Sequence, residues 1–386
     1  MRKIGILTGG GDVPGLNVVI KTVTSRMEDS GVEVLGLKRG WASLLATGRG
    51  SSSPESQWVM RLTHENTRTI DRTGGTILHS SRTNPAAVKP GEIPPHLKDQ
   101  ATTPGPDGKV DMTAAAMRTI EDLGLEGLVA IGGDDTLSFA RRLHQEGVPV
   151  VGVPKTMDND VFGTDYCIGF STAISRSVNM ITDLRSPAGS HERFLVIELF
   201  GRNSGETSLM IALLAQVDRA LISEVPFDPD RVCDLLSKDR WENPSHYAVV
   251  TVSEGASFQG GGIIETGEPD AYGHRKLGGV GLELGEYIKK KTKQGIVYQN
   301  LAYLMRSGAA DALDRLVAIN FARIAADLLL RGEAGKLCAV REGKYTTESL
   351  SIVGEGVKRV NVDRYYDIEQ YRPKLGSVVG LPMFLE

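Results

Sequence analysis

Side chains suited to phosphoryl transfer follow two apolar runs near the middle of the chain. Residues 128–131 end in a Gly-Gly-Asp-Asp turn, and residues 148–153 end in Pro-Lys-Thr-Met-Asp-Asn-Asp. Asp134 could hold a magnesium ion through oxygen, Asp158 could accept a proton from an attacking hydroxyl, and Lys155 could neutralise charge on the transferred group. Four acids and one lysine in such turns are costly unless a metal, a phosphate or a proton transfer uses them.

The segment that carries these groups reads as strand, helix, strand, with the helix beginning near Thr136 and stopping at Gly147. This order predicts a parallel pair with a right-handed crossover, in which functional groups collect at the carboxyl ends of the strands. Asp134 and Asp135 could instead cap the helix, and the Asp158–Asp160 segment could be a simple Asx-turn. The constellation favours the functional reading, because the groups recur at the same kind of position.

A glycine-rich turn near the N-terminus has the same setting. A buried strand over residues 3–7 ends in Thr-Gly-Gly-Gly-Asp-Val-Pro-Gly, and a helical pattern covers residues 18–27. Such a turn can cradle phosphate on backbone N–H groups at a helix N-terminus. The motif matches neither the P-loop nor the dinucleotide fingerprint. From these residues alone, the turn is either a phosphate site or a plain tight turn.

The second half of the chain repeats this rhythm. Strands are expected over residues 193–200, 220–225 and 247–252, with helices over 172–184, 207–216, 281–293 and 310–330. Arg202 and Glu254 follow two of these strands, and Arg193 begins one; arginine can hold a phosphate by fork-like hydrogen bonds. Arg82 follows a further glycine-containing loop. The fold class predicted is α/β, with residues 88–111 as an exposed loop.

Composition narrows the functional class. The 386 residues are 40% hydrophobic and 24% charged with a net charge of −4, which gives no sign of a nucleic-acid or membrane surface. Three separated cysteines suggest no disulfide framework or zinc site. The start of the chain does not read as a signal peptide, and no apolar run approaches the ~18 residues of a membrane helix. We therefore expect a cytoplasmic enzyme with small-molecule substrates.

Seven segments closely resemble the phosphofructokinase family, in the right order and spacing: GILTGGGDVPGLN, GGTILHSSR, IGGDDTLSFARRL, VPKTMDNDVFGTDYCIGF, FGRNSG, SEVPF and TVSEG. The resemblance covers roughly residues 3 to 330. It implies two similar Rossmann-like three-layer domains with mostly parallel sheets and the active site in the cleft between them. Under this interpretation, residues 1–169 with 305–355 form the phosphoryl-donor domain, and residues 170–304 with 356–386 form the fructose 6-phosphate domain.

The resemblance also implies roles. Gly11, Asp135, Lys155 and Arg82 would contact the donor, Asp134 would bind Mg²⁺, and Asp158 would be the base, with Lys155 and Asp135 also catalytic. Fructose 6-phosphate would be bound by Thr156, Asp158, Arg193, Phe200, Gly201, Arg202, Glu254, Tyr303 and Arg306. Arg193 resembles an arginine that reaches across a subunit interface, which implies a homo-oligomer, at least a dimer. The family pattern has another arginine where Val297 stands, and Lys293 is a candidate substitute.

The phosphoryl donor is predicted from two positions. ATP users of the family typically carry glycine after the metal-binding aspartate, whereas this chain has Asp135, and it has Lys155 where many of them carry glycine. A carboxylate at position 135 adds bulk and like charge against a polyphosphate chain. The pair resembles the pyrophosphate-dependent members, so the expected reaction is reversible transfer from pyrophosphate to the 1-hydroxyl of fructose 6-phosphate. The alternatives are an ATP-dependent enzyme, a related lipid kinase, and a non-catalytic regulatory subunit that binds sugar phosphate.

Overall fold

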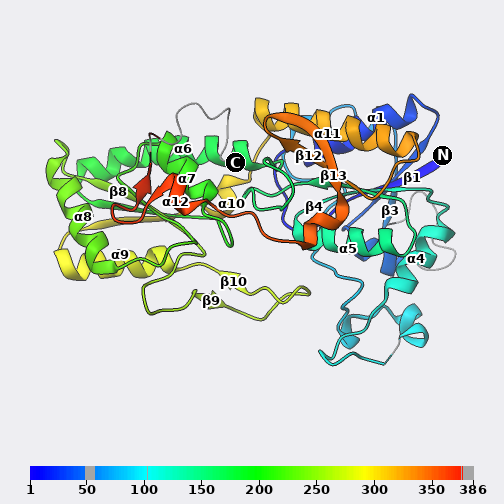
Figure 1. Cartoon of the computed structure of the whole chain (residues 1–386), viewed down its shortest axis with the longest axis horizontal. Coiled ribbons are helices and arrows are strands. Elements are labelled where there is room, and N and C mark those ends of the chain that lie inside the picture. Colours follow the sequence, from blue (N-terminus) through cyan, green and yellow to red (C-terminus); the bar gives the residue numbers. More distant parts are fainter. Residues whose placement is uncertain (48–56, 102, 375, 377–386) are drawn as a thin grey trace.

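The computed structural model describes residues 1–47, 57–101, 103–374 and 376. Two lobes lie along the long axis of the molecule, each built around its own sheet (Figure 1). Within the described ranges, no helix combines the length and the apolar character needed to cross a membrane. Residues 375 and 377–386 of the predicted second domain lie outside the described residues.

The first lobe contains a seven-stranded sheet in the order β13-β12-β5-β4-β1-β2-β3. Neighbouring strands run parallel except at the two edges, where β3 and β13 are antiparallel to their partners. β4 and β5 are buried along their whole length, as expected for strands with helices on both faces. The strand bounds are β1 Lys3–Thr8, β2 Glu33–Leu37, β3 Val59–Leu62, β4 Leu128–Gly132, β5 Val150–Pro154, β12 Lys336–Arg341 and β13 Lys344–Ser349.

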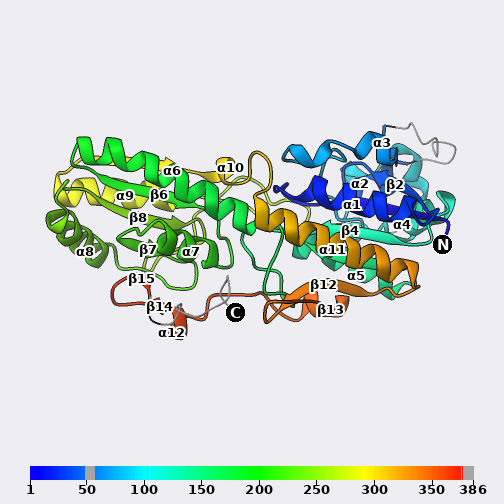
Figure 2. The same ribbon diagram turned by 90° about the horizontal axis from the view of Figure 1, so that it is seen from above.

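Helices cover both faces of this sheet (Figure 2). Ile4 and Ile6 belong to the core beneath one pair of helices, and Leu7 belongs to the core on the opposite face, as the alternation of side chains along a strand requires. The helices of the first face are α1 (Leu16–Glu28) and α11 (Ala312–Leu330), with the short α3 (His64–Thr67) against α1. Those of the second face are α4 (Thr113–Asp122) and α5 (Asp134–Gln145), with the short α2 (Ala42–Ala46) against α4.

The second lobe contains a four-stranded sheet in the order β11-β6-β8-β7, and all of its neighbours are parallel. In Figure 1, α6 and α7 lie above this sheet and α9 lies below it. The bounds are β6 Phe194–Leu199, β7 Arg219–Leu221, β8 Ala248–Ser253, β11 Ile296–Asn300, α6 Phe170–Ser190, α7 Glu206–Leu214, α8 Pro229–Glu242, α9 Val280–Thr292 and α10 Ala302–Met305.

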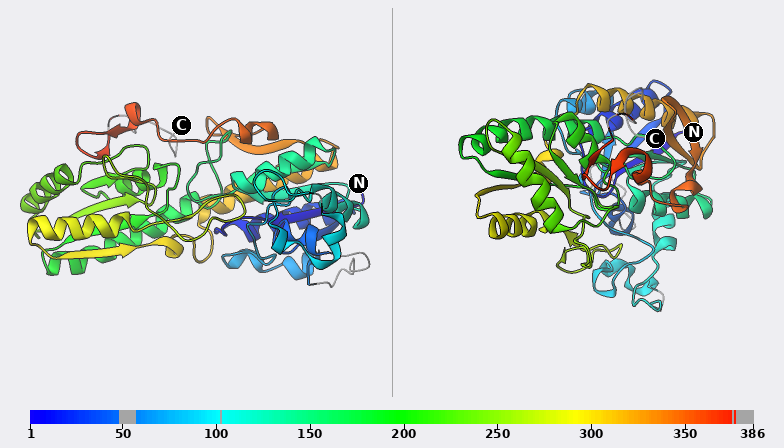
Figure 3. Two further views of the ribbon diagram at one scale, coloured as in Figure 1. Left: turned by 90° about the horizontal axis from the view of Figure 1, so that it is seen from below. Right: turned by 60° about the vertical axis from the view of Figure 1, so that its left-hand side comes forward.

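Two segments pass from one lobe to the other. A hairpin formed by β9 (Glu265–Thr266) and β10 (Lys276–Leu277) extends from the second lobe toward the first (Figure 1). The C-terminal segment leaves β13, forms the 3₁₀ helix η4 (Leu350–Gly354), and crosses to the second lobe (Figure 3). There it ends in three short elements: α12 (Val362–Tyr365), β14 (Tyr366–Asp367) and β15 (Arg372–Pro373).

The predicted α/β class with mostly parallel sheets is confirmed, and the strands of each sheet fall within the residue ranges of the proposed domains. Two of the expected elements differ clearly in extent. The helix expected over 172–184 extends from Phe170 to Ser190, and the strand expected over 220–225 stops at Leu221. β7 is short because the backbone turns directly after it, where the N–H of Val225 donates to the carbonyl of Ile222 at 3.3 Å.

Candidate active site

The turn between β1 and α1 places backbone groups close to the side chains of Lys155 and Arg306. Gly10 and Gly15 have φ values of 75° and 110°, a region that glycine adopts readily. Lys155 Nζ donates to the carbonyl of Gly11 at 2.6 Å. A side chain at Gly11 would collide with the guanidinium of Arg306. The turn therefore combines a helix N-terminus with two adjacent cations, which favours a phosphate.

Asp134 and Asp135 open helix α5 directly after β4. The helix is capped by Gly133 without a side-chain hydrogen bond, so neither aspartate is an N-cap. Asp134 Oδ1 is buried and has no hydrogen-bond partner in the described part of the chain. Burial, together with the carboxylates of Asp160 and Asp135, raises the pKa of Asp134 to about 8. A carboxyl group in this setting is well suited to a bound cation.

Mg²⁺ fits this carboxylate. In the described ranges, no group of three or more His, Cys, Asp or Glu side chains forms a metal cage. Mg²⁺ keeps several waters and commonly binds one or two carboxylates together with substrate phosphates, so it does not require such a cage. Asp134, with its orphaned oxygen, is the residue that would hold the ion beside the donor.

The turn after β5 places Asp158 at the centre of the cleft. Its backbone N–H donates to Thr156 Oγ1 at 3.2 Å, and its Oδ1 is buried without a hydrogen-bond partner among the described residues. Burial and the charges of Asp160 and Glu254 raise the pKa of Asp158. A carboxylate that binds a proton more readily and has a free oxygen suits a general base. Burial, and then Arg306, lowers the pKa of Lys155 to about 8.

The second lobe faces this turn with the ends of β6 and β8. Phe200, Gly201 and Arg202 follow β6, and Gly201 has a φ of 134°. Glu254 follows β8, and its backbone N–H donates to the carbonyl of Leu199 at 2.9 Å. Burial raises the pKa of Glu254 to about 7. Two predicted sugar-binding segments therefore adjoin at one sheet edge.

Arg306 packs beside two aromatic rings, Tyr303 and Phe200, whose centres lie 6.4 Å apart. Its guanidinium carbon lies 4.5 Å from the ring centre of Tyr303 and 5.7 Å from that of Phe200. Arg306 Nη1 also lies 3.7 Å from Asp12 Oδ1 in the glycine turn. The arginine is thus fixed where both the donor turn and the sugar-binding loop can use its charge.

An open cavity of about 920 Å³ contains residues that follow strands of both sheets. Gly201 lies between two lining residues, and Asp135 adjoins the cavity through His274, which lines it. The sequence-predicted residues that line it are Gly11, Arg82, Lys155, Thr156, Asp158, Phe200, Arg202, Glu254, Tyr303 and Arg306. The structure therefore gathers in one cleft ten of the fourteen residues predicted from separate motifs, whereas Asp134, Asp135, Gly201 and Arg193 are not among its lining residues.

Arg193 lies apart from these residues. It precedes the amino end of β6, whereas Phe200 follows the carboxyl end, and it does not line the cavity. Instead, Arg193 packs beside Gly295, where an added Cβ would lie 3.0 Å from Nε. Lys293, the candidate substitute for the missing arginine, lines a separate surface hollow with Gly295. A role for Arg193 in the sugar site needs a second subunit and stays a prediction.

Sequence reasoning missed the hairpin that closes the cleft from below. Asp270 Oδ2 accepts from Arg82 Nη1 at 2.7 Å, and His274 Nε2 lies 3.2 Å from Asp135 Oδ1. The hydrogen bond with Asp135 raises the pKa of His274. Arg82, predicted to contact the donor, is therefore already paired with an acid from the opposite lobe. The Asp-Ala-Tyr-Gly-His sequence at 270–274 was the available signal, since it joins a turn to charged residues.

The chain resembles known proteins over nearly its whole length. The family described as Phosphofructokinase matches residues 3–329. The chain is 36% identical over 371 residues to the pyrophosphate–fructose 6-phosphate 1-phosphotransferase of Amycolatopsis methanolica. The matched region covers 96% of this chain and 99% of that protein. It is 34% identical over 373 residues to the ATP-dependent 6-phosphofructokinase 3 of Streptomyces coelicolor, covering 95% and 99%.

Solved structures agree at the level of the fold. The pyrophosphate-dependent phosphofructokinase of Marinobacter aquaeolei superposes with a TM-score of 0.75 at 18% identity, covering 98% of this chain and 90% of that one. The phosphofructokinase of Saccharomyces cerevisiae gives a TM-score of 0.72 at 21% identity, covering 92% and 45%. With the family match over residues 3–329 and the curated relatives, these findings show that the chain belongs to the phosphofructokinase family.

Proposed function

We propose that this chain transfers a phosphoryl group from pyrophosphate to the 1-hydroxyl of fructose 6-phosphate, giving fructose 1,6-bisphosphate and phosphate. The reaction is reversible and would serve glycolysis and gluconeogenesis. The observation that carries the choice of donor is Asp135, whose carboxylate adjoins the cavity and contacts His274. The names of the relatives support both donors, since pyrophosphate-dependent and ATP-dependent enzymes match at 36% and 34% identity.

The geometry supports a division of labour in the transfer. Asp158 takes the proton from the sugar hydroxyl as the new O–P bond forms and the bridging O–P bond of the donor breaks. Lys155, whose Nζ lies 2.6 Å from the carbonyl of Gly11, neutralises charge on the phosphoryl group. Mg²⁺ on Asp134 would screen the negative charge of the donor. Arg202, Glu254 and Arg306 would orient the sugar phosphate.

Charge explains why a diphosphate suits this cleft better than ATP. Asp134 and Asp135 are both partly exposed at the start of α5, so we expect the donor to pass two carboxylates on its way to Lys155. A longer polyphosphate meets more of this like charge, and such juxtaposition costs several kcal/mol. His274 offsets part of the charge at Asp135, and it comes from a hairpin that already lies against this side of the first lobe.

An ATP-dependent enzyme is the second candidate, favoured by the relatives named as such. One experiment separates the two. Purified protein is assayed with pyrophosphate and with ATP at equal free Mg²⁺, and we expect turnover with pyrophosphate to dominate. Robust turnover with ATP and none with pyrophosphate would reject the proposal, and inactivity with both would favour a regulatory subunit.

Asp135→Gly tests the charge argument directly. We expect the ratio of kcat/KM for ATP to that for pyrophosphate to rise by about tenfold or more, which corresponds to ~1.4 kcal/mol. Asp107→Gly, at an exposed loop aspartate, is the matched control and should leave this ratio unchanged. An unchanged ratio in Asp135→Gly would remove Asp135 from donor selection.

A further inference from the structure

Asn159 lies between the candidate base Asp158 and Asp160, and every polar atom of its side chain is engaged. Its φ is 54°, a conformation that a non-glycine residue keeps only when its surroundings fix it. Asn159 Nδ2 donates to the carbonyl of Asp165 at 2.9 Å and to Glu206 Oε1 at 3.1 Å, while Oδ1 accepts from the N–H of Cys167 at 2.7 Å. The side chain is fully buried. This amide therefore ties the turn that carries the candidate base to the backbone of residues 165 and 167 and to α7.

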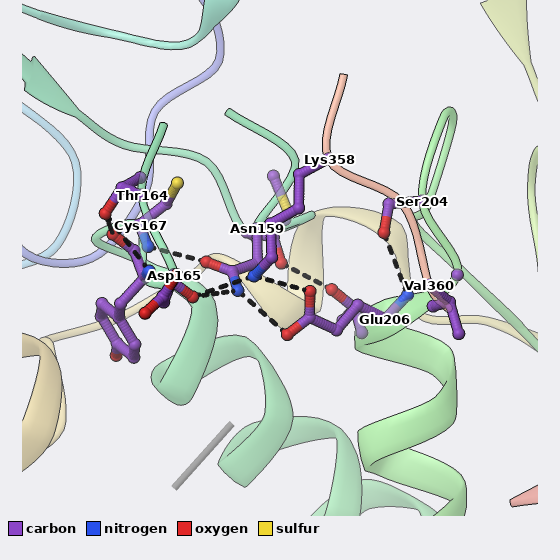
Figure 4. Close-up of polar contacts among 12 residues, drawn as sticks. Asn159, Thr164, Asp165, Cys167, Ser204, Glu206, Lys358 and Val360 are labelled. Carbon is purple, nitrogen blue, oxygen red and sulfur yellow. Dashed lines mark hydrogen bonds and ion pairs between the residues drawn. The ribbon is translucent and has the colours of Figure 1, made fainter. Parts of the chain in front are cut away.

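Glu206 connects that amide to the sugar-binding side of the cleft. It is the first residue of α7, directly after the loop that begins at Phe200, and it is 1% exposed. One of its oxygens accepts from Asn159, and the other lies 2.9 Å from Lys358 Nζ (Figure 4). A buried carboxylate needs such a partner, because its charge is costly without one.

Lys358 belongs to the C-terminal segment that crosses between the lobes. Its Nζ also donates to the carbonyl of Asp165 at 2.9 Å, and its backbone N–H donates to the carbonyl of Asp160 at 3.1 Å. Two residues later, the N–H of Val360 donates to Glu224 Oε1 at 2.9 Å, and Glu224 also holds the N–H of Gly205. The same segment thus contacts the candidate catalytic turn and the start of α7 in the opposite lobe.

We propose that Lys358 is a positioning residue for phosphoryl transfer, acting through Glu206 and Asn159. The lysine neutralises Glu206, Glu206 orients the Asn159 amide, and Asn159 holds the turn that aims Asp158 at the sugar hydroxyl. The C-terminal segment thereby becomes part of the catalytic apparatus, although none of its described residues, up to 374 and 376, lines the cavity. This inference rests on the proposed role of Asp158.

The central variant is Lys358→Met, which keeps much of the length of the side chain and removes its charge and hydrogen bonds. We expect kcat to fall by about 10- to 100-fold, the loss that a small misplacement of a reacting group produces. KM for fructose 6-phosphate should stay within about threefold, because the side-chain hydrogen bonds of Lys358, Glu206 and Asn159 go to one another and to the backbone of residues 165 and 167. Lys358→Arg should recover most of kcat, since it restores the charge.

Lys344→Met, at an exposed lysine that begins β13, is the matched control and should leave kcat and KM as in the wild type. Thermal melting of each variant reports the folded fraction. A double-mutant cycle with Glu206→Gln tests the route, because Lys358→Met should cost far less in that background than in the wild type. If Lys358→Met does not fold, Lys358→Gln replaces it and is judged in the same way.

Wild-type kcat in folded Lys358→Met would overturn the positioning role, as would a loss that only tracks the unfolded fraction. Equal costs of Lys358→Met with and without Glu206→Gln would reject the route through Glu206. The wild-type protein in the same assay keeps the two hypotheses separate. An inactive wild type would reject the proposed function, whereas an active wild type with an unaffected variant would reject only the role of Lys358.

Discussion

Asp158 is the residue on which the proposed chemistry most directly depends. Asp158→Asn keeps the shape of the side chain and removes its ability to take a proton. We expect kcat to fall by about 10²–10⁴, while the dissociation constant of fructose 6-phosphate, measured by calorimetry, changes little. Asp183→Asn, at an exposed position of α6, is the control. A variant that keeps more than about a tenth of wild-type kcat would argue against a general base at this position.

Lys155 and Asp158 together predict the pH dependence of kcat. The pKa of Asp158 is raised, so the base loses its proton, and activity appears, at a higher pH than for an ordinary aspartate. The pKa of Lys155 is lowered to about 8, so the positive charge needed for transfer is present below that pH and is lost as the pH rises through it. We therefore expect a bell-shaped profile with its basic limb near pH 8.

Lys155→Arg tests the assignment of the basic limb. Arginine keeps its charge to about pH 12 or above, so the limb should move upward even if the bulkier side chain lowers kcat. The ionisation of the donor is the same for both proteins and cancels in the comparison. A basic limb that stays in place in Lys155→Arg would assign it to another group.

At the scale of elements, the β9–β10 hairpin of the second lobe contacts the first lobe through residues that belong to none of the recognised sequence motifs. His274 lies beside Asp135, and the carbonyl of Ala271 accepts from Lys109 at 3.0 Å. We expect His274→Ala to raise KM for the phosphoryl donor by about 3- to 10-fold, because one partly exposed charge near an anion contributes roughly 1 kcal/mol. KM for fructose 6-phosphate should stay unchanged.

The pKa of His274 is raised by Asp135, so its charge is present at lower pH and is lost as the pH rises. The difference in donor KM between wild type and His274→Ala should therefore shrink at higher pH. His191→Ala, at an exposed histidine that caps the end of α6, serves as the control. A rise in KM for fructose 6-phosphate alone would show that the hairpin acts on the sugar and not on the phosphoryl donor.

Elements with a clear period were predictable, and those fixed by distant contacts were not. The strands that end at Gly132 and Pro154 were recognisable because each is an apolar run followed by turn residues. The hairpin at 265–277 was missed because its strands have two residues each and no hydrophobic alternation. In the candidate site, Lys358 was equally invisible, since its partner Glu206 lies 152 positions away in the chain (358 − 206).

At the scale of the whole molecule, the cleft lies where the two lobes meet. The glycine turn, Asp134 and Asp158 come from the seven-stranded lobe, and Arg202 and Glu254 come from the other. The two lobes share one continuous core cluster that includes residues of α1, α11, α6 and β6. The position of Asp158 relative to the predicted sugar-binding loop is thus set by packing between lobes as well as by local turns, so we expect residues far from the cleft to affect turnover.

Arg193 is the predicted site residue whose role requires a second copy of the chain. It lies at the amino end of β6, away from the cleft of its own chain, yet it is a predicted ligand of the sugar phosphate. If a second copy supplies it, as expected for a two-fold oligomer, Arg193→Ala in one subunit and Asp158→Asn in the other fall in the same site of a mixed dimer. A hybrid then keeps one intact site, formed by Asp158 of one subunit and Arg193 of the other.

Co-expression of the two variants with different affinity tags provides the test. Each variant alone should have little activity, and an equal mixture should recover about a quarter of the wild-type value, because about half of randomly paired dimers are hybrids with one working site in two. In the control mixture, Arg323→Ala, at an exposed position of α11, replaces Arg193→Ala. The activity of this mixture, relative to the wild type, should equal the fraction of subunits that carry an intact Asp158. If the mixture shows only the sum of the two separate activities, and the purified hybrid dimer shows no recovered activity, Arg193 acts within its own chain.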